Sequence, residues 1–166
     1  MSPSQPFRIL TIGAYGWTEA AFFAALKEAG VDLFCDIRLR RGVRGREYAF
    51  VNSRRLQARL TELGIRYLHV KELAPGKTMR ERQAAADRAR RTAKRERSEL
   101  SEAFVAGYRE ECLACFDARR FIDQVSGARS VALFCVERAP LACHRSLVAE
   151  RLEREFGLEI VHLTPE

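Results

Sequence analysis

The chain has 166 residues, of which 47% are hydrophobic and 31% charged, and its formal net charge is +7. This length predicts a single domain over residues 1–166 that buries a core without disulfides, and the hydrophobic fraction excludes wholesale disorder. No apolar run approaches the ~20 residues that cross a bilayer, and the first residues lack the pattern of an export signal. Together with an odd number of cysteines, five, these features predict a cytoplasmic protein with reduced thiols and no membrane partner.

Residues 7–70 alternate strand-like runs with amphipathic segments. The strand candidates are the β-prone runs Phe7–Ile12, Val31–Ile37 and Ile65–Val70. Between them, two segments with apolar residues at helical spacing end at Gly30 and Gly64. The GAYG sequence at 13–16 follows the first strand. It either presents backbone N–H groups to an anion or forms a tight turn that glycine permits.

Residues 74–99 depart from this alternation because they are strongly basic. Nine Lys or Arg residues stand against four acidic residues, which gives this segment a net charge of +5. Its many alanines predict a helix, and with the apolar stripe that follows we interpret 74–112 as a helical, arginine-rich insertion. The insertion is either a solvated helix or an arm that binds phosphate groups. Arg88, Arg91 and Arg95 are spaced to share one side of such a helix.

Cys112 and Cys115 form a CxxC pair within that apolar stripe. A structural zinc site needs four ligands, and no second pair of cysteines at this spacing follows. We therefore predict that both residues are buried thiols of the core.

The stretch 131–147 concentrates side chains that can do chemistry. Its apolar run VALFCV predicts a buried parallel strand, which Glu137 ends, and Cys143, His144 and Arg145 follow at the start of a helix. Ligands of open α/β sheets bind at the carboxyl ends of strands and at helix N-termini. We therefore expect catalytic roles for Glu137, Cys143 and His144. Glu137 is a general acid or base, whereas Cys143, the most reactive thiol expected, is a nucleophile, a metal ligand or a structural cap.

A metal site is the alternative for the same stretch. Cys135, Glu137, Cys143 and His144 all carry side chains that bind metals. Consecutive Cys and His residues rarely converge on one ion, so we predict no metal, and the sequence does not specify a cofactor.

The strand candidates, with a last one at Leu158–Leu163, are separated mostly by helices. This pattern predicts a Rossmann-like three-layer α/β domain with a mostly parallel sheet of about five strands. In the common doubly wound order the first and fourth strands are neighbours, which brings residues 13–17 and 137–145 to one crevice. Arginine forks match phosphate and carboxylate oxygens. The predicted substrate-binding residues are Gly13, Tyr15, Asp36, Arg38 and Arg145.

The chain resembles domain-of-unknown-function family 488 in its motifs TIG, DIR, NSRRL, GIRYLHVKELAP, CVERAPLACHR and IVHL. The most specific part is C-x-E-x-x-P-x-x-C-H-R, which runs from Cys135 to Arg145. The resemblance extends through nearly the whole chain and implies a compact Rossmann-like α/β domain, while the long basic segment looks like a subfamily feature. It supplies no reaction.

Two classes of function fit these observations. The first is a small cytosolic enzyme, a hydrolase or transferase, that acts on a phosphate- or carboxylate-bearing substrate, including a nucleotide or nucleic acid. The alternative is a non-catalytic module that binds nucleic acid through the arginine-rich insertion. We favour the enzyme because a pocket of Glu, Cys, His and Arg exceeds what a surface binder needs. The sequence does not specify an oligomeric state.

Overall fold

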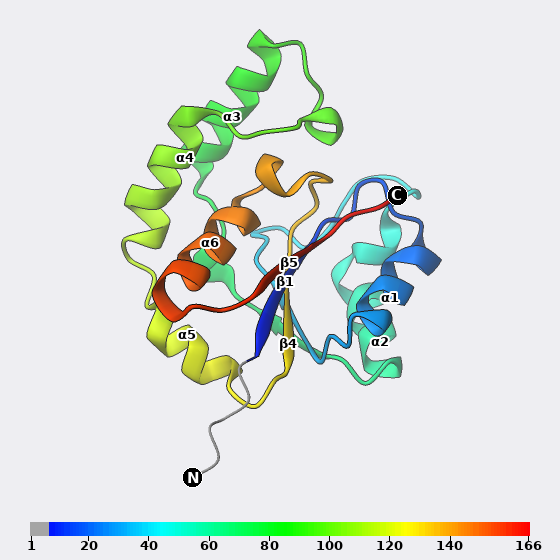
Figure 1. Cartoon of the computed structure of the whole chain (residues 1–166). Helices are drawn as coiled ribbons and strands as arrows, with labels where there is room; N and C mark the ends of the chain where they lie inside the picture. Colours follow the sequence, from blue (N-terminus) through cyan, green and yellow to red (C-terminus); the bar gives the residue numbers. More distant parts are fainter. Residues whose placement is uncertain (1–6) are drawn as a thin grey trace.

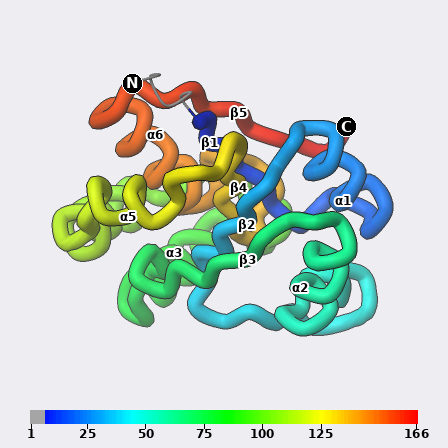
Figure 2. Tube along the Cα trace, turned by 90° about the horizontal axis from the view of Figure 1, so that it is seen from below, coloured from blue at the N-terminus to red at the C-terminus, as the bar shows by residue number. Residues whose placement is uncertain are grey.

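Five parallel strands form the sheet at the centre of the computed structural model, which describes residues 7–166. They are β1 (Arg8–Ile12), β2 (Leu33–Asp36), β3 (Arg66–His69), β4 (Ser130–Phe134) and β5 (Ile160–Leu163). Their order across the sheet is β3-β2-β4-β1-β5, which Figure 2 shows from below. The prediction that no export signal is present concerns residues 1–6 as well, which lie outside the described range.

Helices cover both faces of the sheet. On one side lie α1 (Glu19–Glu28) and α2 (Ser53–Glu62). On the other lie α3 (Lys77–Ala89), α4 (Glu102–Tyr108), α5 (Ala118–Val125) and α6 (His144–Phe156) (Figure 1). This arrangement confirms the predicted Rossmann-like three-layer fold. Among the helices of residues 7–166, none combines the length and the apolar character that crossing a bilayer requires.

The central strands read as continuous apolar runs because both of their faces are covered. All residues of β2 and β4 are buried, whereas the edge strands β3 and β5 are only partly so. A cluster of aromatic rings fixes α1 on its face of the sheet. Phe22 of α1 lies 6.3 Å from Phe34 and 5.8 Å from Phe134, measured between ring centroids.

The order of the strands differs in one respect from the common doubly wound arrangement. The predicted pairing of the first and fourth strands is confirmed, with Ile12 opposite Phe134. However, β4 also pairs with β2, with Asp36 opposite the same Phe134. The crossover through α1 therefore skips one position, which β4 fills, and this gives the most apolar strand two hydrogen-bonded neighbours. As a result, the segment that follows β4 emerges between the ends of β1 and β2.

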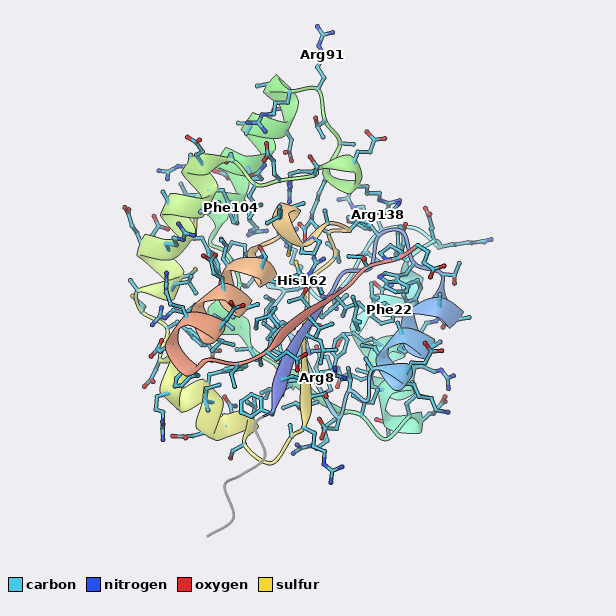
Figure 3. All side chains as sticks on the ribbon, in the orientation of Figure 1. Arg8, Phe22, Arg91, Phe104, Arg138 and His162 are labelled. Atoms are coloured by element: carbon cyan, nitrogen blue, oxygen red, sulfur yellow. The ribbon has the colours of Figure 1, made fainter. Side chains whose placement is uncertain are left out.

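The insertion is less helical than predicted. Helix α3 ends at Ala89, Arg91 adopts a left-handed φ of 53°, and a 3-10 turn over Lys94–Glu96 precedes α4. The prediction that Arg88, Arg91 and Arg95 share one side of a helix is therefore wrong. The chain reverses direction at Arg91, and the residues that follow return to the carboxyl edge of the sheet, where Arg97 is buried. Figure 3 shows Arg91 at the tip, with its side chain pointing away from the domain.

Candidate functional site

A cavity of about 530 Å³ opens between the insertion and the carboxyl ends of β2 and β4. Its walls come from the loop after β2, from the insertion and from the loop between β4 and α6. Seven basic side chains line the cavity, whereas only two acidic side chains do. The basic residues are Arg38, Arg40, Arg44, Arg80, Lys94, Arg95 and Arg97, and the acidic residues are Asp87 and Glu137. This excess of positive charge suits an anionic ligand.

Glu137 lies in the cavity wall just beyond β4 and is 6% exposed. Arg97 donates a hydrogen bond to its Oε1 at 3.1 Å, and the Nζ of Lys94 lies 3.8 Å from the same oxygen. The Cys135 thiol donates to its Oε2 at 3.0 Å. Burial and then the charge of Cys143 raise the pKa of Glu137, against the opposing effect of Lys94. This carboxyl group therefore keeps its proton to a higher pH than an ordinary glutamic acid, which suits it to exchange a proton with a ligand.

Cys143 is the N-cap residue of α6, and it is buried beside His144. Its Sγ lies 3.6 Å from the Nδ1 of His144. Burial opposes ionisation of the thiol, but the hydrogen bond with Cys135 and the charges of His144 and Arg145 outweigh it and lower the pKa of Cys143 well below its usual range. Burial likewise opposes the charged form of His144, but the neighbouring Cys143 raises the pKa of that imidazole. The two groups therefore favour a thiolate–imidazolium pair.

Cys135 joins this pair. Its Sγ, the Sγ of Cys143 and a ring nitrogen of His144 all lie within 4.8 Å of one another, and all three residues are buried. The hydrogen bond with Cys143, and then burial, raise the pKa of Cys135 well above that of an ordinary thiol. The consecutive Cys143 and His144 thus direct their side chains to one place, contrary to the expectation that weighed against a metal.

Asp36 and Arg38 form a buried ion pair at the end of β2. The guanidinium binds the carboxylate through two parallel hydrogen bonds, Nε to Oδ1 at 2.9 Å and Nη2 to Oδ2 at 2.8 Å. The Tyr67 hydroxyl donates to the same Oδ2, and the Arg38 Nη2 also donates to the Val51 carbonyl. Arg38 lines the cavity and Asp36 does not. The Arg38 Nη1 is buried and has no hydrogen-bond partner within the described residues.

Arg145 and Gly13 lie behind the cavity wall instead of lining it. The Arg145 side chain is fully buried and donates to the backbone carbonyls of Glu137, at 2.7 Å, and Arg138, at 3.2 Å. A Cβ atom on Gly13 would lie 1.8 Å from the Glu137 carbonyl oxygen, so only glycine allows the end of β1 to approach so closely. Both residues therefore position the backbone of Glu137.

The GAYG loop is a tight turn in which the N–H groups of its last three residues already have partners. Those of Ala14 and Tyr15 both donate to the carbonyl oxygen of Val136, at 3.0 and 2.9 Å. The N–H of Gly16, which has a left-handed φ of 93°, donates to the Tyr48 hydroxyl at 2.8 Å. Of the two interpretations of this loop, the structure therefore supports the turn. Its one contribution to the cavity is the side chain of Tyr15.

The family model described as "Domain of unknown function DUF488" matches residues 19–152. The chain belongs to the DUF488 family. No curated protein and no solved structure matches the chain. The matched range contains every segment of this DUF488 protein that lines the cavity, with the exception of Tyr15.

The insertion supplies residues that the sequence analysis did not place at the site of this DUF488 protein. Arg80, Lys94, Arg95 and Arg97 line the cavity. Arg95 lies over the rings of Tyr15 and Tyr48, with its guanidinium carbon 5.1 and 5.0 Å from the ring centroids.

Arg97 is the most deeply placed of these residues. It pairs with Asp87 at 2.8 Å and with Glu137 at 3.1 Å. Its guanidinium also donates twice to the Ala142 carbonyl oxygen, at 3.2 and 3.0 Å. The sequence signal was only the positive charge of the whole segment, which does not distinguish a buried arginine from a solvated one. Arg97 therefore ties the insertion directly to Glu137.

The CxxC pair is less buried than predicted. Cys112 is half-buried and Cys115 is exposed, so the prediction of two buried thiols is wrong for Cys115. The helical stripe ends in a π-helical turn at Arg109–Leu113, and Cys115 lies beyond it.

Proposed function

We propose that this DUF488 protein is an enzyme, a hydrolase or transferase, that acts on a substrate carrying a phosphate or carboxylate group. The observation that carries the proposal is the meeting of Glu137, Cys143 and His144 in the wall of a cavity with seven basic side chains. Positive charges in a partly water-excluded cavity hold an anion more strongly than charges in bulk water. A nucleophile or metal ligand and a proton-exchanging group then lie next to the bound substrate.

Each group has a distinct role in this proposal. Arg38 is held rigidly by Asp36 and contributes a fixed positive charge to the cavity wall. Lys94 and Arg95 are exposed and supply further positive charge. Glu137 exchanges a proton with the substrate, because its pKa is raised. Cys143 contributes a thiolate, which acts as a nucleophile or as a metal ligand. The cytoplasmic location belongs to the same proposal, since all five cysteines are free thiols.

The alternative, a module that binds nucleic acid through the insertion, accounts for fewer of the structural observations. Four of the insertion's nine basic residues in 74–99 line the cavity. Among the others, Arg88 and Arg91 are exposed and outside the cavity lining. These two residues provide a matched comparison, because removing them takes the same charge from the same segment without touching the cavity.

The test is isothermal titration of the full chain with inorganic pyrophosphate and with succinate at low ionic strength. We expect Lys94→Ala/Arg95→Ala to weaken binding of at least one of these anions by about tenfold or more, equivalent to about 1.4 kcal/mol. The control Arg88→Ala/Arg91→Ala should bind within about twofold of wild type, since neither of these two charges lines the cavity that holds the anion. Equal losses in both pairs, or no binding of either anion, would contradict the proposal.

A single-stranded oligonucleotide titrated against the same variants tests the alternative. If the oligonucleotide binds tightly, loses affinity in Arg88→Ala/Arg91→Ala and keeps it in Lys94→Ala/Arg95→Ala and in Glu137→Gln, the insertion acts as a nucleic-acid arm and the enzyme proposal fails. Weak oligonucleotide binding that follows the cavity variants supports the proposed function.

A further inference from the structure

Three atoms of the kind that bind zinc converge in the cavity wall. They are the Sγ atoms of Cys135 and Cys143 and a ring nitrogen of His144, all within 4.8 Å of one another. We propose that these three residues bind a zinc ion whose fourth position faces the cavity. The inference deepens the proposed function and rests on it for the substrate that approaches this fourth position.

The geometry already matches that of a zinc site. Zinc binds thiolate sulfur at about 2.3 Å and histidine nitrogen at about 2.0–2.1 Å, and a tetrahedral angle between these bonds separates the two ligand atoms by about 3.6 Å. The Cys143 Sγ lies 3.6 Å from the His144 Nδ1. The separation of these two atoms is therefore the one that a shared zinc ion requires, and the Cys135 Sγ lies within 4.8 Å of the Cys143 Sγ and of a His144 ring nitrogen.

The hydrogen bond made by His144 determines which of its two ring nitrogens can bind the ion. Its Nε2 donates a hydrogen bond to the Ile37 carbonyl at 3.2 Å. A carbonyl oxygen only accepts hydrogen bonds, so the Nε2 must carry a proton, and in the neutral ring the lone pair is then on Nδ1. Histidine ligands of zinc commonly have this support, in which the second ring nitrogen is fixed by a carbonyl or carboxylate.

The ligand set selects the metal and its role. Two sulfurs and an imidazole suit zinc, whereas calcium and magnesium prefer oxygen. Structural zinc sites have four protein ligands, while catalytic sites have three and leave one position to water or substrate. Cys135, Cys143 and His144 all line the cavity, so this position is accessible to a bound anion. A divalent cation also compensates two thiolates that would otherwise be buried close together.

Glu137 completes the chemistry without being a ligand. Its Oε2 lies 3.0 Å from the Cys135 Sγ, beside the three ligand atoms. A zinc-bound water would transfer a proton to the Glu137 carboxylate, and the resulting hydroxide would attack the phosphorus or carbonyl carbon of the substrate. As the bond to the leaving group breaks, Glu137 would return the proton to that group. The reaction consumes one water and needs no oxidant or reductant.

The test is the metal content of the full chain, produced without a histidine tag and purified without chelator, measured by plasma mass spectrometry. We expect stoichiometric zinc in the wild type and loss of the bound zinc in Cys143→Ser and in His144→Gln. The control Cys112→Ser/Cys115→Ser should keep its zinc, because it removes two thiols that do not belong to the proposed site. Wild-type protein without zinc, or a control that loses the zinc as the site variants do, would overturn the inference.

Replacing zinc by cobalt in the wild-type protein provides a second test, which does not depend on whether a site variant folds. Wild-type protein dialysed against Co²⁺ should develop thiolate-to-cobalt charge-transfer absorption and the visible bands of four-coordinate cobalt, as should the Cys112→Ser/Cys115→Ser control. Absence of these bands in folded wild-type protein would contradict the zinc site. Pyrophosphate and succinate titrations separate this failure from that of the proposed function, because the basic side chains, and not the zinc, provide most of the anion binding.

Discussion

Arg97→Met removes the cation that joins the insertion to the candidate site. The Arg97 side chain is 8% exposed and pairs with two carboxylates, those of Asp87 and Glu137. Methionine fills a similar volume but removes the buried cation that the two acids share, so that within residues 7–166 Asp87 keeps no ion pair and Glu137 keeps only the longer contact with Lys94, at 3.8 Å. Removing one partner of a buried ion pair costs about 3–5 kcal/mol. This is a large part of the roughly 5–15 kcal/mol by which domains are stable, and for a chain of this length it lowers Tm by about 6–20 °C.

Urea unfolding followed by circular dichroism measures this loss, with Arg88→Met as the matched control. Arg88 is exposed in the same insertion, so its replacement should change the free energy of unfolding by no more than about 0.5 kcal/mol. The double variant Arg97→Met/Glu137→Gln should recover part of the loss, because a neutral amide no longer requires a cation. A loss below about 1 kcal/mol in Arg97→Met, or no recovery in the double variant, would refute the reasoning.

Two further predictions concern the backbone and the ionisation of Glu137. Gly13→Ala should destabilise the domain by more than about 2 kcal/mol in urea unfolding, because its Cβ would meet the Glu137 carbonyl oxygen at 1.8 Å; Gly42→Ala, whose Cβ would meet only a side-chain oxygen at 3.7 Å, should be nearly neutral. Since the folded-state pKa of Glu137 is raised from about 4.5, its contribution to stability is complete below that pH and is lost as pH rises through the raised value. In chelator-treated protein, the stability of Glu137→Gln relative to wild type should therefore increase as the pH rises above about 4.5, and a difference that is flat with pH would contradict the raised pKa.

Much of the fold was predictable because the central strands are covered on both faces. Val131–Phe134 is an unbroken apolar run, and such a run is typical of a central strand that is covered on both faces in an α/β domain. The pairing of β1 with β4 followed from the same pattern. The position of β4 between β1 and β2 could not be predicted in this way. How many strand positions a crossover skips depends on how helix α1 packs, and local sequence preferences do not specify that packing.

The site was predictable where one short motif contains it. Glu137, Cys143 and His144 come together because the motif joins a strand end to a helix start within a few residues. The role of Arg145 was not readable, since an arginine that supports backbone carbonyls has the same local sequence as one that faces a ligand. Arg97 was hidden in a run of charge, and only its tertiary contacts with Glu137 distinguish it from the exposed Arg88.

The selectivity of alkylation at Cys143 tests most directly the central claim, a thiolate in the wall of an anion-binding cavity. Chelator-treated protein is labelled with iodoacetate, which is anionic, or iodoacetamide, which is neutral, and the rate at each cysteine is followed by mass spectrometry. Cys115 is the internal reference, because it is exposed and lies near Glu111 and Asp117. At low ionic strength the iodoacetate-to-iodoacetamide rate ratio should be about tenfold higher at Cys143 than at Cys115, and salt should reduce the difference. Equal ratios at the two cysteines, or no reaction of Cys143 with either reagent, would contradict the claim.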